Sequence, residues 1–196
     1  RKDIIRLCEK HSDCAFHAFT NATLIDEELC REMQRVGNLS LSISLEGFEE
    51  VNDGRRGQGI YKKVLDAMDL LKAHGLIFGT SICYTRNNVD VVSSDEFLDL
   101  IIEKGCRFTW YFHYMPVGND AATELLPTRE QREYMYHRVR EIRAKEGGKP
   151  FLPWTSRMTA GMWEAASQGK VLLPHQSQRR YGTLCVYPLF GCQYTQ

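Results

Sequence analysis

The sequence predicts an α/β protein in which parallel strands alternate with helices around a single sheet. Short apolar segments rich in β-branched and aromatic residues alternate with segments of helical periodicity, and clusters of glycine, proline and asparagine separate them. Polar side chains also gather where the strand-like segments end. Strands joined through helices run parallel, and such sheets place their ligands at the carboxyl ends of the strands.

The expected elements follow from apolar spacing and from capping residues. Asp26 is the expected N-cap of one helix and Ser93 or Ser94 that of another, with Glu96 in place for a capping box. Helices are expected over 1–12, 27–36, 60–74, 94–104 and 128–145, strands over 14–19, 39–47, 76–84 and 107–115, and loops over 49–59 and 85–92. A polar, glycine-rich loop as long as 49–59 directly after a strand is usually functional.

Composition indicates one soluble domain and excludes some classes of partner. The 196 residues balance 25 basic against 25 acidic side chains, so no single-sign field favours nucleic acid or an anionic membrane. There is no apolar run of about 20 residues and no signal peptide at the start, so we expect a cytoplasmic protein.

The seven cysteines show none of the short paired spacings of a zinc or disulfide framework. We therefore expect a reducing compartment and no metal site, with four of the cysteines acting as small buried apolar side chains. These four are Cys8, Cys30, Cys83 and Cys106.

Three motifs at the strand ends, in order, resemble the radical S-adenosylmethionine (radical SAM) superfamily over about residues 1–150. FTNATLID at 19–26 is similar to a TNG-type turn, SISLEG at 42–47 to an S-x-D/E-G strand end, and NDGRRG at 52–57 to a D-x-x-R-G loop. The resemblance is to the branch of molybdenum-cofactor, quinone-cofactor and sulfatase-maturing enzymes. It implies a partial (βα) barrel, and the chain is expected to lack the first βα unit.

The resemblance also implies cofactors and partners. Members bind S-adenosylmethionine and a four-iron four-sulfur cluster, generate a 5'-deoxyadenosyl radical, and modify a peptide or small-molecule substrate with an electron donor protein as partner. The cluster is held by a C-x-x-x-C-x-x-C loop. That spacing is absent from the printed chain. We therefore expect an N-terminally truncated enzyme that is inactive alone, and no catalytic residue is assigned.

The resemblance assigns cofactor-binding residues at each strand end. Arg56 offers a planar fork for the ligand's carboxylate, although its neighbour Arg55 could face the ligand instead. Ser44 is expected at the methionine or ribose portion, and Glu46 at the ligand or the substrate. The remaining expected contacts are Asn21 in the first turn, Ser81 and Asn87 near the ribose and adenine, and Pro116 and Val117 against the adenine. Of His113 and Tyr114, we expect Tyr114 to face the barrel interior.

The tail over 151–196 departs from the family and is expected to be irregular and poorly ordered. Residues 170–191 can be back-translated into DNA with suitable third bases. Read one base later, that DNA encodes KYFFHINPKGDMEPCVFIHYSD, which is similar to the family's glycine-acid-x-E-P-C continuation. Residues 153–167 read two bases later permit MDFQNDGRNVGGCIA. Frame slips near 149–152 and 168–170 would remove the cysteines of a SPASM or twitch auxiliary cluster.

Two other functions remain open on the sequence alone. One is a non-radical βα-barrel lyase or hydrolase that uses Glu46 and Asp53 as an acid/base pair. The other is a non-catalytic fragment that binds a nucleotide-like ligand, or a partner through an open edge strand.

Overall fold

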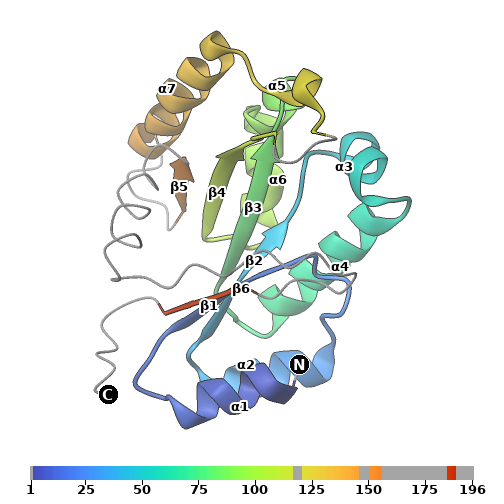
Figure 1. Ribbon diagram of the computed structural model, residues 1–196. Helices are drawn as coiled ribbons and strands as arrows, with labels where there is room; N and C mark the ends of the chain where they lie inside the picture. The colour runs from blue at the N-terminus through green and yellow to red at the C-terminus, as the bar shows by residue number, and fades with distance from the viewer. Residues whose placement is uncertain (1, 117–120, 146–150, 156–184, 189–196) are drawn as a thin grey trace.

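The computed structural model describes residues 2–116, 121–145, 151–155 and 185–188. Their core is one six-stranded sheet with the order β5-β4-β3-β2-β1-β6 (Figure 1). Neighbouring strands from β1 to β5 run parallel, and β6 runs antiparallel to β1. The strands are β1 Phe16–Thr20, β2 Leu39–Ser44, β3 Phe78–Tyr84, β4 Phe108–His113, β5 Leu152–Thr155 and β6 Cys185–Pro188. The predicted parallel α/β fold is confirmed.

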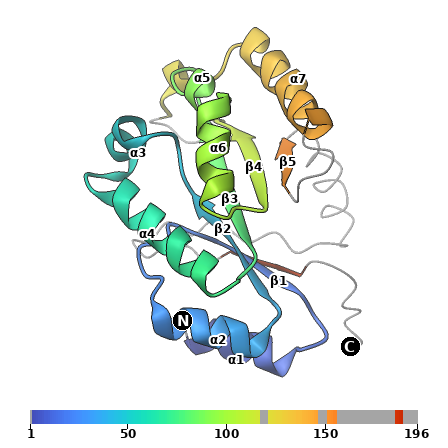
Figure 2. The ribbon, with the colours of Figure 1, turned by 180° about the vertical axis from the view of Figure 1, so that it is seen from behind.

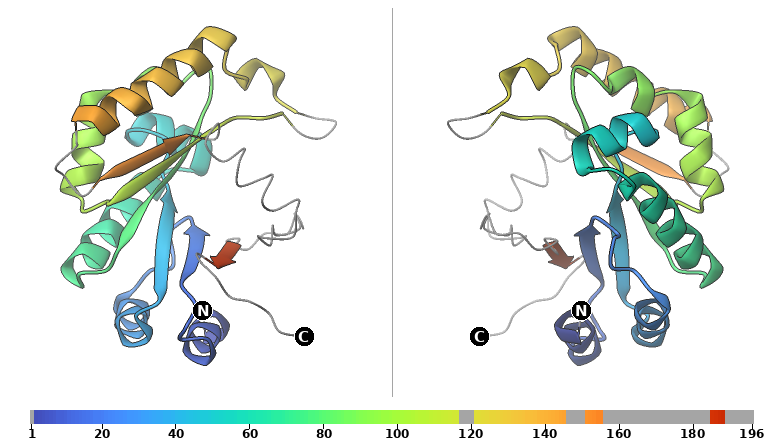
Figure 3. Two further views of the ribbon diagram at one scale, coloured as in Figure 1. Left: turned by 90° about the vertical axis from the view of Figure 1, so that its left-hand side faces the viewer. Right: turned by 90° about the vertical axis from the view of Figure 1, so that its right-hand side faces the viewer.

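The helices lie on the outer, convex side of this sheet, as the rear and side views show (Figures 2 and 3). They are α1 Lys2–Lys10, α2 Glu27–Val36, α3 Glu49–Arg56, α4 Ile60–Ala73, α5 Val89–Val92, α6 Asp95–Glu103 and α7 Arg129–Lys145, with a 3-10 turn at Thr123–Leu125. None of the helices in the described ranges is long and apolar enough to cross a membrane.

Local signals explain where several helices begin and end. The Asp26 side chain accepts a hydrogen bond from the Leu29 N–H at 2.9 Å, and Gly37 ends α2 in the left-handed region at φ 72°. Ser94, not Ser93, caps α6 by accepting from the Phe97 N–H. A capping box needs its glutamate three positions after the cap. With Ser94 as the cap that position is Phe97, so the predicted capping box with Glu96 does not form.

The predicted loops over 49–59 and 85–92 were wrong in part, since they contain α3 and α5. Gly54 and Asn52 lower the helix propensity of α3. The helix dipole favours α3, however, because Glu49 and Glu50 lie in its first turn and arginines lie in its last turn. The buried Asn52 side chain also ties α3 to the end of β2 by accepting from the Glu46 N–H at 3.1 Å. Tertiary contacts thus outweigh the propensity of this segment.

The sheet is curled into a partial barrel. Side chains of β1 and β4 meet although β2 and β3 separate these strands: the His17 and Trp110 rings stack with centroids 5.9 Å apart, and Phe19 lies 6.1 Å from Phe112. Such contacts require a concave face, which we call the lumen. Alternation then places Ser40, Ser42 and Ser44 of β2 and Ser81 and Cys83 of β3 on the lumen face.

Two short strands, β5 and β6, lie within the predicted tail, so that segment is not wholly irregular. β6 pairs with β1 from Phe16↔Pro188 to Phe19↔Cys185, and therefore covers the outer edge of β1. The proposed frame slips and most of the tail lie outside the described residues. The boundary at residue 150 stays a prediction.

Candidate functional site

The candidate site is built around Glu46, two residues beyond the end of β2. Its side chain is only 1% exposed, and it forms ion pairs with Arg55 (Nη1 to Oε2, 3.0 Å) and with Arg56 (Nη2 to Oε1). The Cys83 backbone N–H donates a third hydrogen bond to Oε2 at 3.2 Å. A buried carboxylate is stable only when it is paired and hydrogen-bonded in this way, so Glu46 fixes both guanidinium groups at one place.

Two buried amide side chains, which the sequence reading did not single out, hold Glu46 in position. Asn52 binds its backbone N–H, and the Asn88 Nδ2 donates to its backbone carbonyl at 2.9 Å. The Asn88 Oδ1 in turn accepts from the Thr85 N–H at 2.6 Å, which fixes the loop after β3. The only sequence signal for Asn88 was its position after a strand end. The exposed Asn87 has the same signal, so the sequence does not distinguish the two.

Asp53 has a structural role in the same segment. Its carboxylate accepts from the backbone N–H groups of Gly59 (2.6 Å) and Tyr61 (2.7 Å) and so caps the start of α4. Burial opposes ionisation of Asp53, but these backbone hydrogen bonds outweigh it and lower the pKa of the carboxyl group. Both carboxylates of the acid/base alternative, Glu46 and Asp53, are thus occupied by contacts within the fold.

A pocket of about 350 Å³ opens in front of the two arginines. The lining residues come from the turn after β1, the end of α3 and the start of α4; they are Asn21, Thr23, Arg55, Arg56 and Ile60. This lining carries two positive charges and no carboxylate. The Arg56 Nε is buried and has no hydrogen-bond partner among the described residues. An unpaired buried donor is costly, so this group is suited to a ligand with an acceptor.

Asn21 shapes its side of this pocket. Its Oδ1 accepts from the Thr23 N–H at 3.3 Å and from the Thr23 hydroxyl at 3.0 Å, and Ala22 between them adopts a left-handed conformation at φ 62°. Asn21 is therefore a turn-forming residue that also lines the pocket, in agreement with its expected place.

The two predicted serines lie opposite each other on the lumen face. Ser44 and Ser81 are partners in the β2–β3 register. Both are half-buried, and neither hydroxyl has a hydrogen-bond partner among the described residues. They therefore remain available to a ligand.

The other predicted contacts are less well placed. Asn87 is exposed in the turn before α5, and Pro116 ends a described range. Val117 lies outside the described residues. The alternation of Phe108, Trp110 and Phe112 places Tyr114 on the lumen side, as expected.

Three of the four cysteines that were expected to be buried are buried, namely Cys8, Cys30 and Cys106. The fourth, Cys83, is half-buried. Cys83 faces the lumen beside Arg55; burial raises the pKa of its thiol, and Arg55 opposes that shift. The described ranges hold no group of three or more His, Cys, Asp or Glu side chains that could bind a metal ion.

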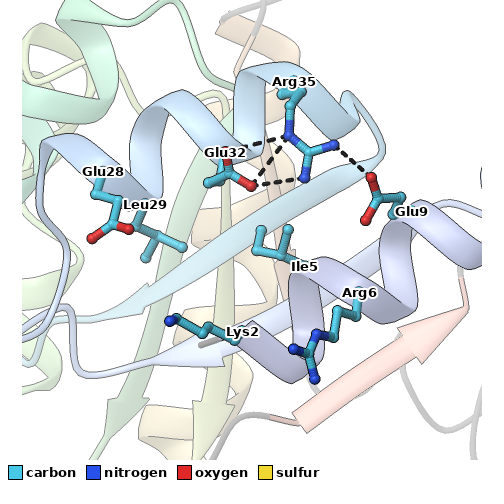
Figure 4. Close-up of a pocket in the computed structure, with 8 residues that line it drawn as sticks. All are labelled: Lys2, Ile5, Arg6, Glu9, Glu28, Leu29, Glu32 and Arg35. Carbon is cyan, nitrogen blue, oxygen red and sulfur yellow. Dashed lines mark hydrogen bonds and ion pairs between the residues drawn. The ribbon is translucent and has the colours of Figure 1, made fainter.

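A second pocket, of about 330 Å³, lies between α1 and α2 on the outer side of the protein (Figure 4). It is lined by Lys2, Ile5, Arg6, Glu9, Glu28, Leu29, Glu32 and Arg35. Arg35 is already paired with Glu9 (2.8 Å) and Glu32 (2.7 Å), so the opposite charges satisfy one another. The strand-end pocket, where one carboxylate is shared by two arginines and a positive charge is left over, is therefore the candidate site.

Comparisons with known proteins agree with this geometry. The family model described as "Radical SAM superfamily" matches residues 1–101. An Fe-coproporphyrin III synthase from Methanosarcina barkeri is 28% identical over 153 residues, which cover 74% of this chain and 38% of that protein.

Solved structures share the fold at low identity. SuiB of Streptococcus suis bound to S-adenosylmethionine superposes with a TM-score of 0.60 at 16% identity, covering 78% of this chain and 35% of that one. The enzyme anSMEcpe with bound S-adenosylmethionine gives 0.59 at 17% identity, covering 79% and 42%. The chain thus spans about two fifths or less of the length of these relatives. Enzymes of the matched family bind S-adenosylmethionine and a four-iron four-sulfur cluster, and this chain belongs to the radical SAM superfamily.

Proposed function

We propose that the chain is the S-adenosylmethionine-binding part of a radical SAM enzyme that modifies a peptide or small-molecule substrate, and that Arg56 binds the carboxylate of the cofactor. The observation that supports this most directly is the buried Arg56 Nε, a donor without a partner among the described residues, on a side chain that lines the strand-end pocket. A carboxylate is the natural acceptor for a guanidinium fork.

The other parts of the ligand have suitable partners nearby. The free hydroxyls of Ser44 and Ser81 could bind the methionine or ribose portion, and Asn21 lines the same pocket. Glu46, buried behind the arginines, would orient Arg56 rather than touch the ligand. These residues bind and position a cofactor, and none of them supplies the radical.

The cluster does not fit the residues described. Neither the printed sequence nor the described structure contains three suitably spaced cysteines. The described residues of this chain would therefore bind and orient the cofactor. The three motifs at 19–26, 42–47 and 52–57 favour the branch of maturase-like enzymes.

Binding of S-adenosylmethionine, measured by isothermal titration calorimetry, tests the proposal. Arg56→Lys keeps the charge but loses the fork, and we expect it to weaken binding about tenfold, equivalent to about 1.4 kcal/mol. The matched control is Arg107→Lys, because Arg107 is exposed and precedes β4 at the opposite end of the sheet. Equal affinities of the wild type and Arg56→Lys would contradict the assignment, and absence of binding to the wild type would contradict the function.

A further inference from the structure

Arg55, the neighbour of Arg56, presents an unused edge of its guanidinium group. Nη1 donates to both Glu46 Oε2 at 3.0 Å and the Cys83 carbonyl at 3.2 Å. The Nε and Nη2 atoms have no partner among the described residues, and the side chain is 38% exposed. Nε and Nη2 point the same way from a planar guanidinium, so the free edge is one that a carboxylate binds with two parallel hydrogen bonds.

The Arg55 guanidinium group lies at the carboxyl end of β3, next to the lumen. Arg55 reaches from the end of α3 to the end of β3, where Cys83 is paired in register with Phe112 of β4. Tyr114, which directly follows β4, lies on the same face by alternation. Half-buried aromatic rings, Phe19 and Phe112 among them, line the lumen below. A group bound to Arg55 would therefore be attached to an apolar body inside the barrel.

The charges give the two arginines separate partners. Glu46 supplies one negative charge to two guanidinium groups, which leaves one positive charge facing the pocket. If the cofactor's carboxylate neutralises Arg56, Arg55 stays paired with Glu46 but still has two donors unused. Because the Arg55 side chain is 38% exposed, a ligand's acceptor can pair with these donors in place of water.

We propose that Arg55 binds a carboxylate of the substrate and thereby selects substrates that carry a carboxylate on an apolar, ring-containing body. This inference rests on the proposed function, because it gives the cofactor's carboxylate to Arg56. Two sources of the carboxylate share this chemistry. One is a propionate-bearing tetrapyrrole such as coproporphyrin III, and the other is a peptide with an acidic side chain between aromatic ones.

Two matched probe pairs test Arg55 with the purified protein, with and without S-adenosylmethionine. The first pair is coproporphyrin III and its tetramethyl ester, and the second is acetyl-Phe-Glu-Phe-amide and the same peptide with glutamine. We expect the wild type to prefer the acid of at least one pair by about tenfold, and Arg55→Lys to abolish that preference. The pair that shows the preference identifies the source of the carboxylate.

The outcomes separate this inference from the function on which it rests. Without S-adenosylmethionine, Arg55→Lys should abolish the preference for the acid, whereas Arg56→Lys should keep it. If Arg56→Lys abolishes the preference and Arg55→Lys keeps it, the roles of the two arginines are exchanged and the inference is wrong. Absence of any acid preference in the wild type would also overturn it. If S-adenosylmethionine does not bind, the proposed function is wrong. The probe affinities measured without S-adenosylmethionine still test the role of Arg55.

Discussion

At the scale of single residues, the lumen contains a buried histidine that the sequence reading missed. His17 is 2% exposed, and its Nδ1 and Nε2 lie 2.8 Å from the hydroxyls of Ser40 and Ser42. Ser40 donates its own hydrogen to the Phe16 carbonyl, so it accepts from Nδ1–H, and Nε2 accepts from Ser42. Both ring nitrogens are thus satisfied in the neutral form, and a second ring proton would face a donor.

His17 should make the protein less stable in mild acid. Burial lowers its pKa to about 4, against 6.5 for an exposed histidine. Between these values the unfolded chain binds the proton and the folded chain does not. Stability is therefore complete above pH 6.5 and falls as the pH decreases toward 4, by about 3 kcal/mol.

Urea unfolding at pH 7, 5 and 4 measures this effect. We expect His17→Gln to be less stable at pH 7 but to show a shallower pH dependence than the wild type. His137→Gln, in which the lost side chain is exposed on α7, is the control and should keep the wild-type slope. Identical slopes for His17→Gln and the wild type would refute the role of His17.

Residues of the candidate site were predictable where a single strand end determines their position. Glu46, Arg56 and Asn21 do meet at one place, because parallel strands bring their carboxyl ends to the same edge. Asn52 and Asn88 were missed, since their roles depend on which backbone groups lie opposite them after folding. Periodicity carries no information about such pairings.

At the scale of elements, the sequence predicted the helices with strong caps and missed those held by tertiary contacts. α2 and α6 begin at residues that cap through their own side chains, and such signals are local. Neither α3 nor α5 has a side-chain cap. Their stability comes from Glu46 and its partners, which are distant in sequence.

The close packing of β3 against β4 depends on a glycine. A Cβ at Gly79 would lie 2.2 Å from the Phe108 carbonyl oxygen and 2.5 Å from its ring. Because a backbone atom must move, we expect Gly79→Ala to lower the free energy of unfolding by about 3 kcal/mol.

The control for this prediction is Gly54→Ala in α3. A Cβ there meets nothing within 4 Å, so the substitution should raise stability by about 0.5 to 1 kcal/mol through helix propensity. Denaturant unfolding distinguishes the two. A neutral Gly79→Ala would show that the strands do not approach as closely as described.

At the scale of the whole molecule, curvature of the sheet assembles the site. The pocket joins the turn after β1 to the end of α3, and Arg55 reaches from there to the end of β3. In a flat sheet β1 and β4 would lie three strand spacings apart, about 14 Å. The ring contacts across the lumen bring them much closer, and they face the same space that a substrate would enter.

A double-mutant cycle between Phe19 of β1 and Phe112 of β4 measures this curvature in solution. Their ring centroids lie 6.1 Å apart, a distance at which aromatic pairs contribute about 0.5 to 1.5 kcal/mol beyond burial. We expect Phe19→Leu and Phe112→Leu to show a coupling energy of that size in urea unfolding. The control is the same double-mutant cycle between Phe19 and Phe97. Because Phe97 is buried on the outer helix α6, its coupling energy with Phe19 should be near zero. Zero coupling between Phe19 and Phe112 would mean that β1 and β4 do not meet, and the arginines would then have no enclosed lumen in which to hold a substrate.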